Sequence, residues 1–128
     1  MKVGMNECFF DTYAIVELNK GNTNYSKYLD STLVTTLLNL MEFYNTLLRE
    51  NAKEIAIAKF NKYLPSCIQL NSDIIKEAVE FRLEFNKETK FKISYVDAIG
   101  YIISLKLGIE FLTGDDAFKD LKNVEFVK

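Results

Sequence analysis

Short apolar segments alternate with helix-like segments along this 128-residue chain. The apolar segments are rich in aromatic or β-branched side chains, as buried strands are. Strands that alternate with helices are joined by right-handed crossovers and lie mostly parallel, with helices on both faces of the sheet. The chain is therefore predicted to form a three-layer α/β/α sandwich with a mostly parallel central sheet. The predicted strands are ECFFD (7–11), TLVTT (32–36), SCIQL (66–70), IEFLT (109–113) and VEFV (124–127).

The segments between these strands carry helical signals. Asn71 or Ser72 is expected to cap one helix, and Gly108 to end another. The helix that begins at Leu37 has apolar residues at the spacing i, i+3, i+4, i+7 and i+11, which predicts a buried face of Leu37, Leu40, Met41, Tyr44 and Leu48. The other predicted helices span residues 12–19, 24–31, 53–64, 73–85 and 93–108.

Composition limits the class of protein. With 48% hydrophobic and 27% charged residues, the chain is typical of one globular domain, here residues 1–128. No apolar run approaches the roughly 20 residues that cross a bilayer, and the N-terminus lacks the pattern of a signal peptide. We therefore expect a cytoplasmic protein without a membrane segment, and disorder in the first residues, MKVGMN (1–6).

The absence of histidine narrows the chemistry. The chain has no histidine, and its two cysteines, Cys8 and Cys67, form no CxxC pair. Ser-His-Asp catalysis, Cys-His catalysis and a typical zinc site are thereby excluded. Sixteen Lys and Arg against eighteen Asp and Glu give no overall nucleic-acid signature. Any catalysis has to come from carboxylates, hydroxyls, lysines or a hard cation held by oxygen.

Acidic residues stand at the ends of two predicted strands. Asp11 ends the first strand, and Asp115 and Asp116 follow IEFLT through a Thr-Gly turn. Ligands of parallel sheets bind at the carboxyl ends of the strands, so these acids are expected on the functional rim. Each has a structural alternative, because Asp is favoured at helix N-caps and in turns.

Two further acids lie on predicted helices. Asp97 has capping-box spacing from Ser94, with Asp in place of the usual Glu, yet an apolar helix face continues beside it. Glu42 flanks the apolar stripe of its helix, where a solvated surface is the alternative. Several carboxylates on one rim suit Mg²⁺ or Mn²⁺. Such an ion can activate a water and neutralise the charge on a phosphodiester.

Three segments carry a more specific pattern. They are FFDTYAIVEL (9–18), LLNLMEFYNTLLRE (37–50) and ISYVDAIGYIISLKLGIEFLTGDDAFKDLKNVEFV (93–127). In order and spacing they resemble the PIN-domain ribonucleases, especially the VapC-type toxins of prokaryotic toxin–antitoxin pairs. The last segment is the most specific, with an acid early in a helix and then a strand running into Thr-Gly-Asp-x-x-Phe.

The resemblance implies a function for four acids. It implies cleavage of single-stranded RNA by an activated water, with Mg²⁺ or Mn²⁺ bound by Asp11 and Asp97. Glu42 and Asp115 would complete the acidic pocket, directly or through water. None of the four family acids is missing from the chain.

Other residues are expected around this pocket. Thr12 and Thr113 are candidates to hold the acids in place through their hydroxyls, and Asp116 adds a neighbouring charge that is expected to be solvated. Tyr13 stands where many relatives carry a small polar residue, so it is expected to alter the pocket rim. Candidate contacts to RNA phosphates are Lys20, Lys27, Lys90 and Lys92.

The resemblance also suggests protein partners and leaves alternatives open. An antitoxin is a candidate partner, and the Tyr- and Phe-rich helices of residues 23–63 are expected to form such an interface or a homodimer. One alternative is a catalytically weak PIN-like domain that binds protein or RNA. The other is a haloacid dehalogenase-like phosphatase, suggested by GDDAFKD (114–120), although Tyr13 occupies the position where that family's opening motif needs a second Asp.

Overall fold

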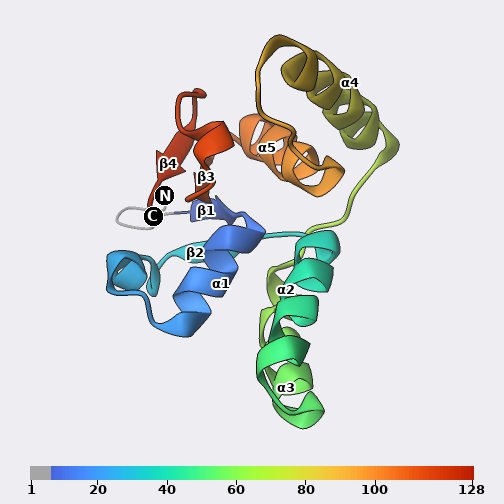
Figure 1. Ribbon diagram of the computed structural model, residues 1–128. Coiled ribbons are helices and arrows are strands. Elements are labelled where there is room, and N and C mark those ends of the chain that lie inside the picture. The colour runs from blue at the N-terminus through green and yellow to red at the C-terminus, as the bar shows by residue number, and fades with distance from the viewer. Residues whose placement is uncertain (1–6) are drawn as a thin grey trace, which may run out of the picture.

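A computed structural model of the chain describes residues 7–128 (Figure 1), so the expected disorder of residues 1–6 lies outside the described residues. Within this range an all-parallel sheet with the strand order β2-β1-β3-β4 runs through the centre. In its register Phe9 pairs with Val34 on one side and with Phe111 on the other. The strands are β1 (Glu7–Phe10), β2 (Thr32–Val34), β3 (Glu110–Thr113) and β4 (Val124–Phe126).

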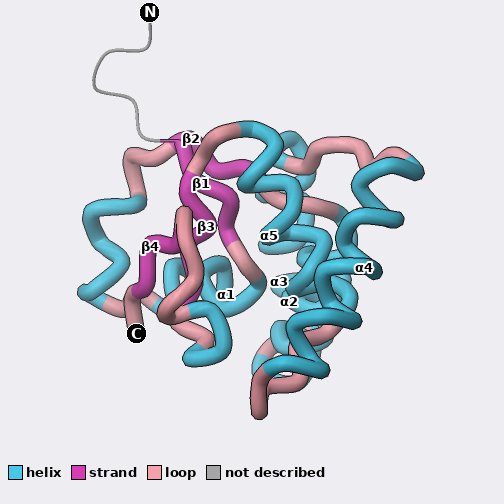
Figure 2. Tube along the Cα trace, turned by 90° about the horizontal axis from the view of Figure 1, so that it is seen from above, coloured by secondary structure: helices cyan, strands magenta, loops and turns pink. Residues whose placement is uncertain are grey.

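Helices cover both faces of this sheet, which confirms the predicted three-layer sandwich (Figures 1 and 2). Helices α1, α2 and α3 pack on one face, and α4 and α5 on the other. No helix of the described residues combines the length and the apolar character needed to cross a membrane. The helices are α1 (Thr12–Lys20), α2 (Leu37–Glu50), α3 (Lys53–Tyr63), α4 (Ser72–Glu88) and α5 (Tyr95–Leu107), with short 3₁₀ helices η1 (Thr23–Tyr28), η2 (Leu64–Ser66) and η3 (Asp116–Phe118).

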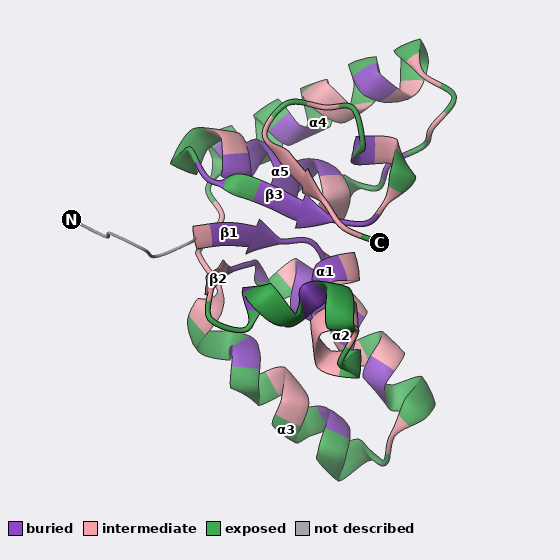
Figure 3. Cartoon of the chain, turned by 90° about the vertical axis from the view of Figure 1, so that its left-hand side faces the viewer, coloured by how far each residue is buried: buried purple, intermediate pink, exposed green. Residues whose placement is uncertain are grey.

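Alternate strand residues supply two separate cores. The Phe9 and Phe111 side chains stack at 5.8 Å between ring centroids, on the face that α4 and α5 cover. Phe10 and Leu112 point to the opposite face, against α1, α2 and α3. Successive side chains of a strand alternate between faces, and a sheet that is buried on both faces needs near-continuous apolar strands. After their first residues, the central strands β1 and β3 are accordingly buried throughout (Figure 3).

Several local signals act as predicted. The Asn71 side chain caps α4 by accepting a hydrogen bond from the Ile74 backbone N–H at 2.9 Å. Gly108 ends α5 in the left-handed region, with φ +67°. Cys8 is buried, Cys67 is half-buried, and both are free thiols.

The strand predicted for residues 66–70 is wrong. Only a single bridge forms there, between Thr35 and Cys67 at the edge of the sheet. Pro65 lies in η2, so the chain enters this edge from a 3₁₀ turn. It then leaves after the Ile68 N–H donates to the Thr35 carbonyl at 3.0 Å, because it has to cross to the other face to begin α4.

The face predicted to be buried on α2 is also largely wrong. Of the five residues of the expected stripe, only Leu40 is buried. The other apolar residues of α2 that are buried, Phe43 and Leu47, lie outside that stripe. Leu37, Met41 and Leu48 are exposed, and Tyr44 is half-buried. The helix is turned so that two polar residues on its other side join a hydrogen-bond network at the sheet edge, as described below.

Candidate functional site

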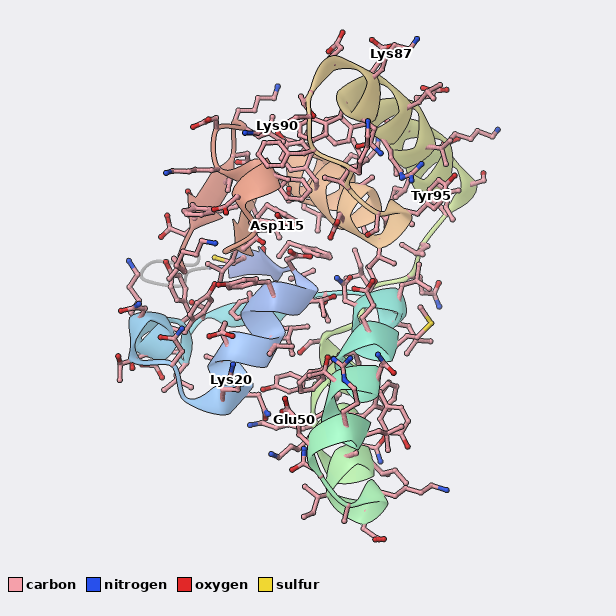
Figure 4. The ribbon with its side chains drawn as sticks, in the orientation of Figure 1. Lys20, Glu50, Lys87, Lys90, Tyr95 and Asp115 are labelled. Carbon is pink, nitrogen blue, oxygen red and sulfur yellow. The ribbon has the colours of Figure 1, made fainter. Side chains whose placement is uncertain are left out.

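An open pocket of about 570 Å³ lies at the carboxyl ends of β1 and β3. Asp11 follows β1 and Asp115 follows β3, while Asp97 reaches the pocket from the first turn of α5. Figure 4 shows Asp115 between α1 and the pair of helices α4 and α5. The sheet therefore brings together three of the four expected acids, and the remaining lining residues are Thr12, Tyr13, Phe91, Gly114, Asp116 and Lys128.

Asp11 is the buried acid at the base of the pocket. It occupies the N-cap position of α1, but its side chain makes no capping hydrogen bond. Its Oδ2 instead accepts a hydrogen bond from the Thr113 hydroxyl at 2.7 Å. Its Oδ1 is buried and has no hydrogen-bond partner among the described residues. A buried carboxylate oxygen without a partner is costly, so helix capping does not account for this side chain.

Asp97 and Asp115 each use one carboxylate oxygen to fix the local backbone. Asp97 Oδ2 accepts from the Ser94 N–H, and Ser94 Oγ accepts from the Asp97 N–H, both at 3.0 Å, which is the predicted capping box. Asp115 Oδ1 accepts from the Ala117 N–H at 3.0 Å and caps η3. In both residues the structural alternative is therefore real. It still leaves the second oxygen of each carboxylate without a hydrogen bond to the described residues.

Glu42 is joined to the pocket through a chain of buried or half-buried polar side chains. Its Oε1 accepts from the Thr12 hydroxyl at 2.6 Å. Thr12 in turn accepts from Asn39 Nδ2 at 3.1 Å, and Asn39 Oδ1 accepts from the Thr36 hydroxyl at 2.7 Å. This network places Glu42 and Asn39 on the sheet side of α2, so the solvated alternative for Glu42 does not hold. Asn39, which is fully buried, was missed from the sequence, although a lone amide inside the apolar run LLNLM (37–41) is a signal for such a network.

Burial, and then repulsion between the acids, raises the pKa of the carboxyl groups of this site. Burial is the largest cause that raises the pKa of Asp11, followed by the charge of Asp97, while the Thr113 hydroxyl opposes the shift. Burial likewise raises the pKa of Asp97, against the stabilising contacts from Ser94. Glu42 has its pKa raised by burial, with the Thr12 hydrogen bond acting in the opposite direction. A cation would offset both the cost of burying the charged carboxylates and the repulsion between them.

The donor set fits a hard divalent ion that keeps part of its water shell. Among residues 7–128, no three acidic or cysteine side chains form a preformed metal cage. Mg²⁺ does not need one, because it typically takes one or two carboxylates and retains several waters. The unpartnered Oδ1 of Asp11, beside the free oxygens of Asp97 and Asp115, provides such ligands.

Thr113 and Gly114 fix the loop that carries Asp115. Thr113 Oγ1 accepts from the Asp115 N–H at 3.1 Å while it donates to Asp11, so one hydroxyl ties two acids together. The φ of Gly114 lies outside the left-handed region. A Cβ on Gly114 would lie 2.3 Å from the Tyr13 ring and 2.4 Å from the Val127 carbonyl oxygen. Glycine is needed here for close approach rather than for turn geometry.

Two of the four lysines proposed for RNA lie away from the pocket. Lys20 is at the C-terminal end of α1, roughly 13 Å of helix from Asp11 at a rise of about 1.5 Å per residue. Figure 4 shows Lys20 at the end of this helix, away from Asp115. It pairs with Glu17 at 3.3 Å. Lys27, in η1, pairs with Glu125 at 3.7 Å. Each of these lysines therefore has an acidic neighbour and lies outside the pocket lining.

The other two lysines flank a pocket residue. Lys90 and Lys92 stand on either side of Phe91 in the loop between α4 and α5, with the Lys90 Nζ 5.6 Å from the Phe91 ring centroid. A cation missed from the sequence is Lys128, which lines the pocket and pairs with the exposed Asp116 at 3.2 Å. Only the chain's return along β4 brings it there, so no local pattern announces it.

Comparisons with known proteins agree with this arrangement. The sequence profile of the PIN domain matches residues 8–124. No curated protein matches the sequence. Among solved structures, the fold is similar to that of VapC20 of Mycobacterium tuberculosis, a toxin that cleaves the sarcin–ricin loop. The TM-score is 0.75 at 21% identity, covering 94% of this chain and 99% of that one.

Two toxin–antitoxin complexes are also similar in fold. A complex from Klebsiella pneumoniae has a TM-score of 0.71 at 18% identity, covering 92% of this chain and 95% of that one. VapBC2 from Rickettsia felis, bound to a DNA fragment of its promoter, has a TM-score of 0.71 at 17% identity, covering 95% and 99%. At these identities the likeness concerns the fold, whereas the profile match spans most of the chain. The chain belongs to the PIN domain family.

Proposed function

We propose that this protein is an endoribonuclease that uses Mg²⁺ or Mn²⁺ to cleave single-stranded RNA. We further propose that residues 1–128 act as one domain in the cytoplasm, as the toxin of a toxin–antitoxin pair. Membership of the PIN domain family supports a nuclease, and the likeness to toxins and toxin–antitoxin complexes supports the toxin role.

One observation carries this proposal. Asp11 is buried beside the charges of Asp97 and Asp115, and its Oδ1 has no partner. A side chain in this position destabilises the fold unless a proton or a cation compensates it. A cation held by carboxylates next to an open pocket is an arrangement that supports metal-assisted phosphodiester hydrolysis.

The side chains divide the work of such a site. Asp11 and Asp97 would hold the ion, and Asp115 and Glu42 would complete its surroundings directly or through water. When bound, the ion supplies an activated water and neutralises charge on the phosphodiester. Thr113 orients Asp11 through its 2.7 Å hydrogen bond. Thr12 orients Glu42 through its 2.6 Å hydrogen bond to Oε1.

The direct test is cleavage of a panel of labelled single-stranded RNAs with Mg²⁺, with Mn²⁺ and with EDTA. Cleavage is expected with either ion and not with EDTA. Asp11→Asn and Asp97→Asn are expected to lose at least about 100-fold in rate while staying folded. Asp120→Asn is the matched control, because Asp120 is exposed and does not line the pocket. Full activity in both pocket variants would refute the assignment.

We also propose that exposed apolar residues of α2 and α3 form a protein interface, with an antitoxin or a second copy of the chain. Leu37, Met41 and Leu48 on α2 and Ile55 and Ile57 on α3 are each at least 40% exposed. Light scattering after gel filtration, for the chain alone and with the protein encoded by the neighbouring gene, tests both partners. Met41→Glu is expected to weaken whichever complex forms, and an unchanged mass would exclude α2 from it.

The phosphatase alternative has little left to support it. Tyr13, where that family needs a second Asp, is packed against Gly114 at the pocket wall. Asp120, its candidate closing acid, is exposed outside the pocket. A catalytically weak binding domain stays an alternative, and it predicts RNA binding without cleavage in every metal condition of the same panel.

A further inference from the structure

Two aromatic side chains line the acidic pocket and have no role in holding its acids. Tyr13 is in the first turn of α1, and Phe91 is in the loop between α4 and α5. They come from opposite faces of the sheet, because α1 covers one face and α4 and α5 cover the other. Both are half-buried, so each ring is partly available to a ligand.

The Tyr13 ring is held in a defined position. It packs so closely on Gly114 that a Cβ there would lie 2.3 Å from a ring carbon. Its hydroxyl makes no hydrogen bond to the described residues, whereas the buried Tyr25, Tyr28 and Tyr101 each bond through theirs. A tyrosine fixed at its ring and unpaired at its hydroxyl, beside an open pocket, is suited to contact a ligand.

Phe91 is braced by its own loop. Its backbone N–H donates to Thr89 Oγ1 at 3.2 Å, and the same hydroxyl donates to the Phe85 carbonyl at 2.9 Å, which ties the loop to the end of α4. The Lys90 ammonium lies 5.6 Å from the Phe91 ring centroid. An aromatic face with a neighbouring cation offers both a stacking platform and an attraction for phosphate.

The chemistry of the pocket selects among ligands for these rings. Its floor is acidic, so an anionic group enters only where a cation neutralises the carboxylates. The neutral, flat rings on its walls suit a nucleobase, since every base has a π-face that stacks on an aromatic ring. A base inside a duplex is already stacked and paired, whereas an unpaired base is free to enter. A volume of about 570 Å³ is in the range that accommodates a small-molecule-sized group.

We propose that Tyr13 and Phe91 form a subsite for one unpaired nucleobase, adjacent to the phosphodiester at the acidic floor of the pocket. This rests on the proposed ribonuclease function and adds the reason for a single-strand requirement. The base is recognised by stacking, so the subsite admits any base and excludes a paired one. Tyr13 and Phe91 position the substrate and take no part in the bond cleavage.

Binding is measured with a single-stranded oligoribonucleotide that carries 2-aminopurine, whose fluorescence is quenched by stacking. The Asp97→Asn protein with Mn²⁺ serves as the background, since it is expected to bind without cutting. Quenching is expected with the single strand and not with the duplex. Adding Tyr13→Leu or Phe91→Leu is expected to remove the quenching and to weaken binding about tenfold, within the range for loss of one base–aromatic stack.

Two control variants separate stacking from damage to the fold. Tyr13→Phe keeps the ring and is expected to keep the quenching. Tyr95→Leu removes an aromatic ring that is 55% exposed and outside the pocket, and is expected to change nothing. Circular dichroism and thermal melts of Tyr13→Leu and Phe91→Leu establish that both are folded.

Cleavage by the active protein gives an independent readout. An RNA with an abasic residue at the sensitive position should be cut equally by the unaltered protein and by Tyr13→Leu, while the intact RNA should show a higher KM in the variant. Unchanged quenching in both Leu variants, or the same KM increase with the abasic RNA, would overturn the subsite. Quenching without cleavage in any metal would instead refute the ribonuclease proposal and leave the subsite standing, so the two failures are distinguishable.

Discussion

Replacing Asp11 by Asn is expected to stabilise the metal-free protein while removing its response to metal. Asn has the shape of Asp and keeps an oxygen for the Thr113 hydroxyl, which lies 2.7 Å from Asp11 Oδ2. It has no charge to bury beside Asp97 and Asp115. The unpartnered Oδ1 becomes an amide that donates toward neighbouring carboxylates instead of repelling them. The substitution therefore removes an electrostatic cost and leaves the packing intact.

The size of this effect follows from the burial of the carboxyl. An uncompensated buried charge costs about 3–5 kcal/mol. Taking up a proton does not avoid this cost at pH 7, because the pKa of Asp11 is raised from 3.8 to about 8 and holding the proton over this interval costs about 4 kcal/mol. Burying the amide of Asn costs about 1–3 kcal/mol in turn, so we expect a net gain of about 2 kcal/mol in the metal-free protein. For a chain of this length each kcal/mol changes the Tm by about 4 °C, so Asp11→Asn should raise the metal-free Tm by about 8 °C.

The response to metal should reverse this order. An ion at 100 times its Kd stabilises the folded state by about 2.7 kcal/mol, and only the unaltered protein is expected to gain this. Thermal melts by circular dichroism in EDTA and in MnCl₂ measure both effects. Asp120→Asn is the control, since Asp120 is exposed and does not line the pocket. A lower Tm of Asp11→Asn in EDTA, or a stabilisation by Mn²⁺ equal to that of the unaltered protein, would refute the reasoning.

Three other predictions concern the same site. In EDTA, the Tm should fall as pH rises above about 4. The reason is that Asp11, Glu42 and Asp97 have higher pKa values in the folded than in the unfolded protein. Their protonated forms stabilise the fold fully below the unfolded pKa, and this contribution is lost as pH rises through the folded pKa. Melts across pH measure this, and Mn²⁺ should flatten the profile; a Tm that rises with pH in EDTA would contradict it. Gly114→Ala should lower the free energy of unfolding in urea by about 1–3 kcal/mol, since its Cβ would meet the Val127 carbonyl at 2.4 Å; an unchanged midpoint would show that the backbone gives way. Thr113→Val should destabilise the fold by about 1–3 kcal/mol and move the pH profile of RNA cleavage upward, because Thr113 holds the pKa of Asp11 down and accepts from the Asp115 N–H; a pH profile that does not move would exclude this role.

The strands at the centre of the sheet were predictable from local sequence. Segments such as ECFF and EFLT are buried on both faces, so they are apolar at nearly every position and stand out in any window. The edge segment at Cys67 failed for the opposite reason. Its composition is strand-like, but its position beyond β2 allows only one bridge before the chain has to leave for α4. Pairing at an edge depends on where the chain goes next, and composition does not carry that information.

The helices show the same division. The N-cap at Asn71 and the C-cap at Gly108 depend on a few neighbouring residues, and both formed as predicted. The buried face of α2 depends on distant partners. Apolar residues lie around much of this helix, and packing against β1, β3 and α1 buries Leu40, Phe43 and Leu47 among them. On the same side, Glu42 accepts from Thr12, 30 residues away in sequence.

For the site, the sequence alone determined the kind of chemistry. With no histidine and with acids at the ends of two apolar strands, it excluded histidine-based catalysis and favoured carboxylate and cation chemistry at the rim of a parallel sheet. Only the tertiary structure decided which carboxylate oxygens accept hydrogen bonds from the protein and which have no partner. Asp97 and Asp115 satisfy their local roles with one oxygen each, and Asp11 keeps an unpartnered one. It also placed Tyr13, Phe91 and Lys128 around the same pocket. The reason is physical: side-chain type sets what a group can bind, while burial and distance, which arise from contacts across the whole chain, set whether it is free to do so.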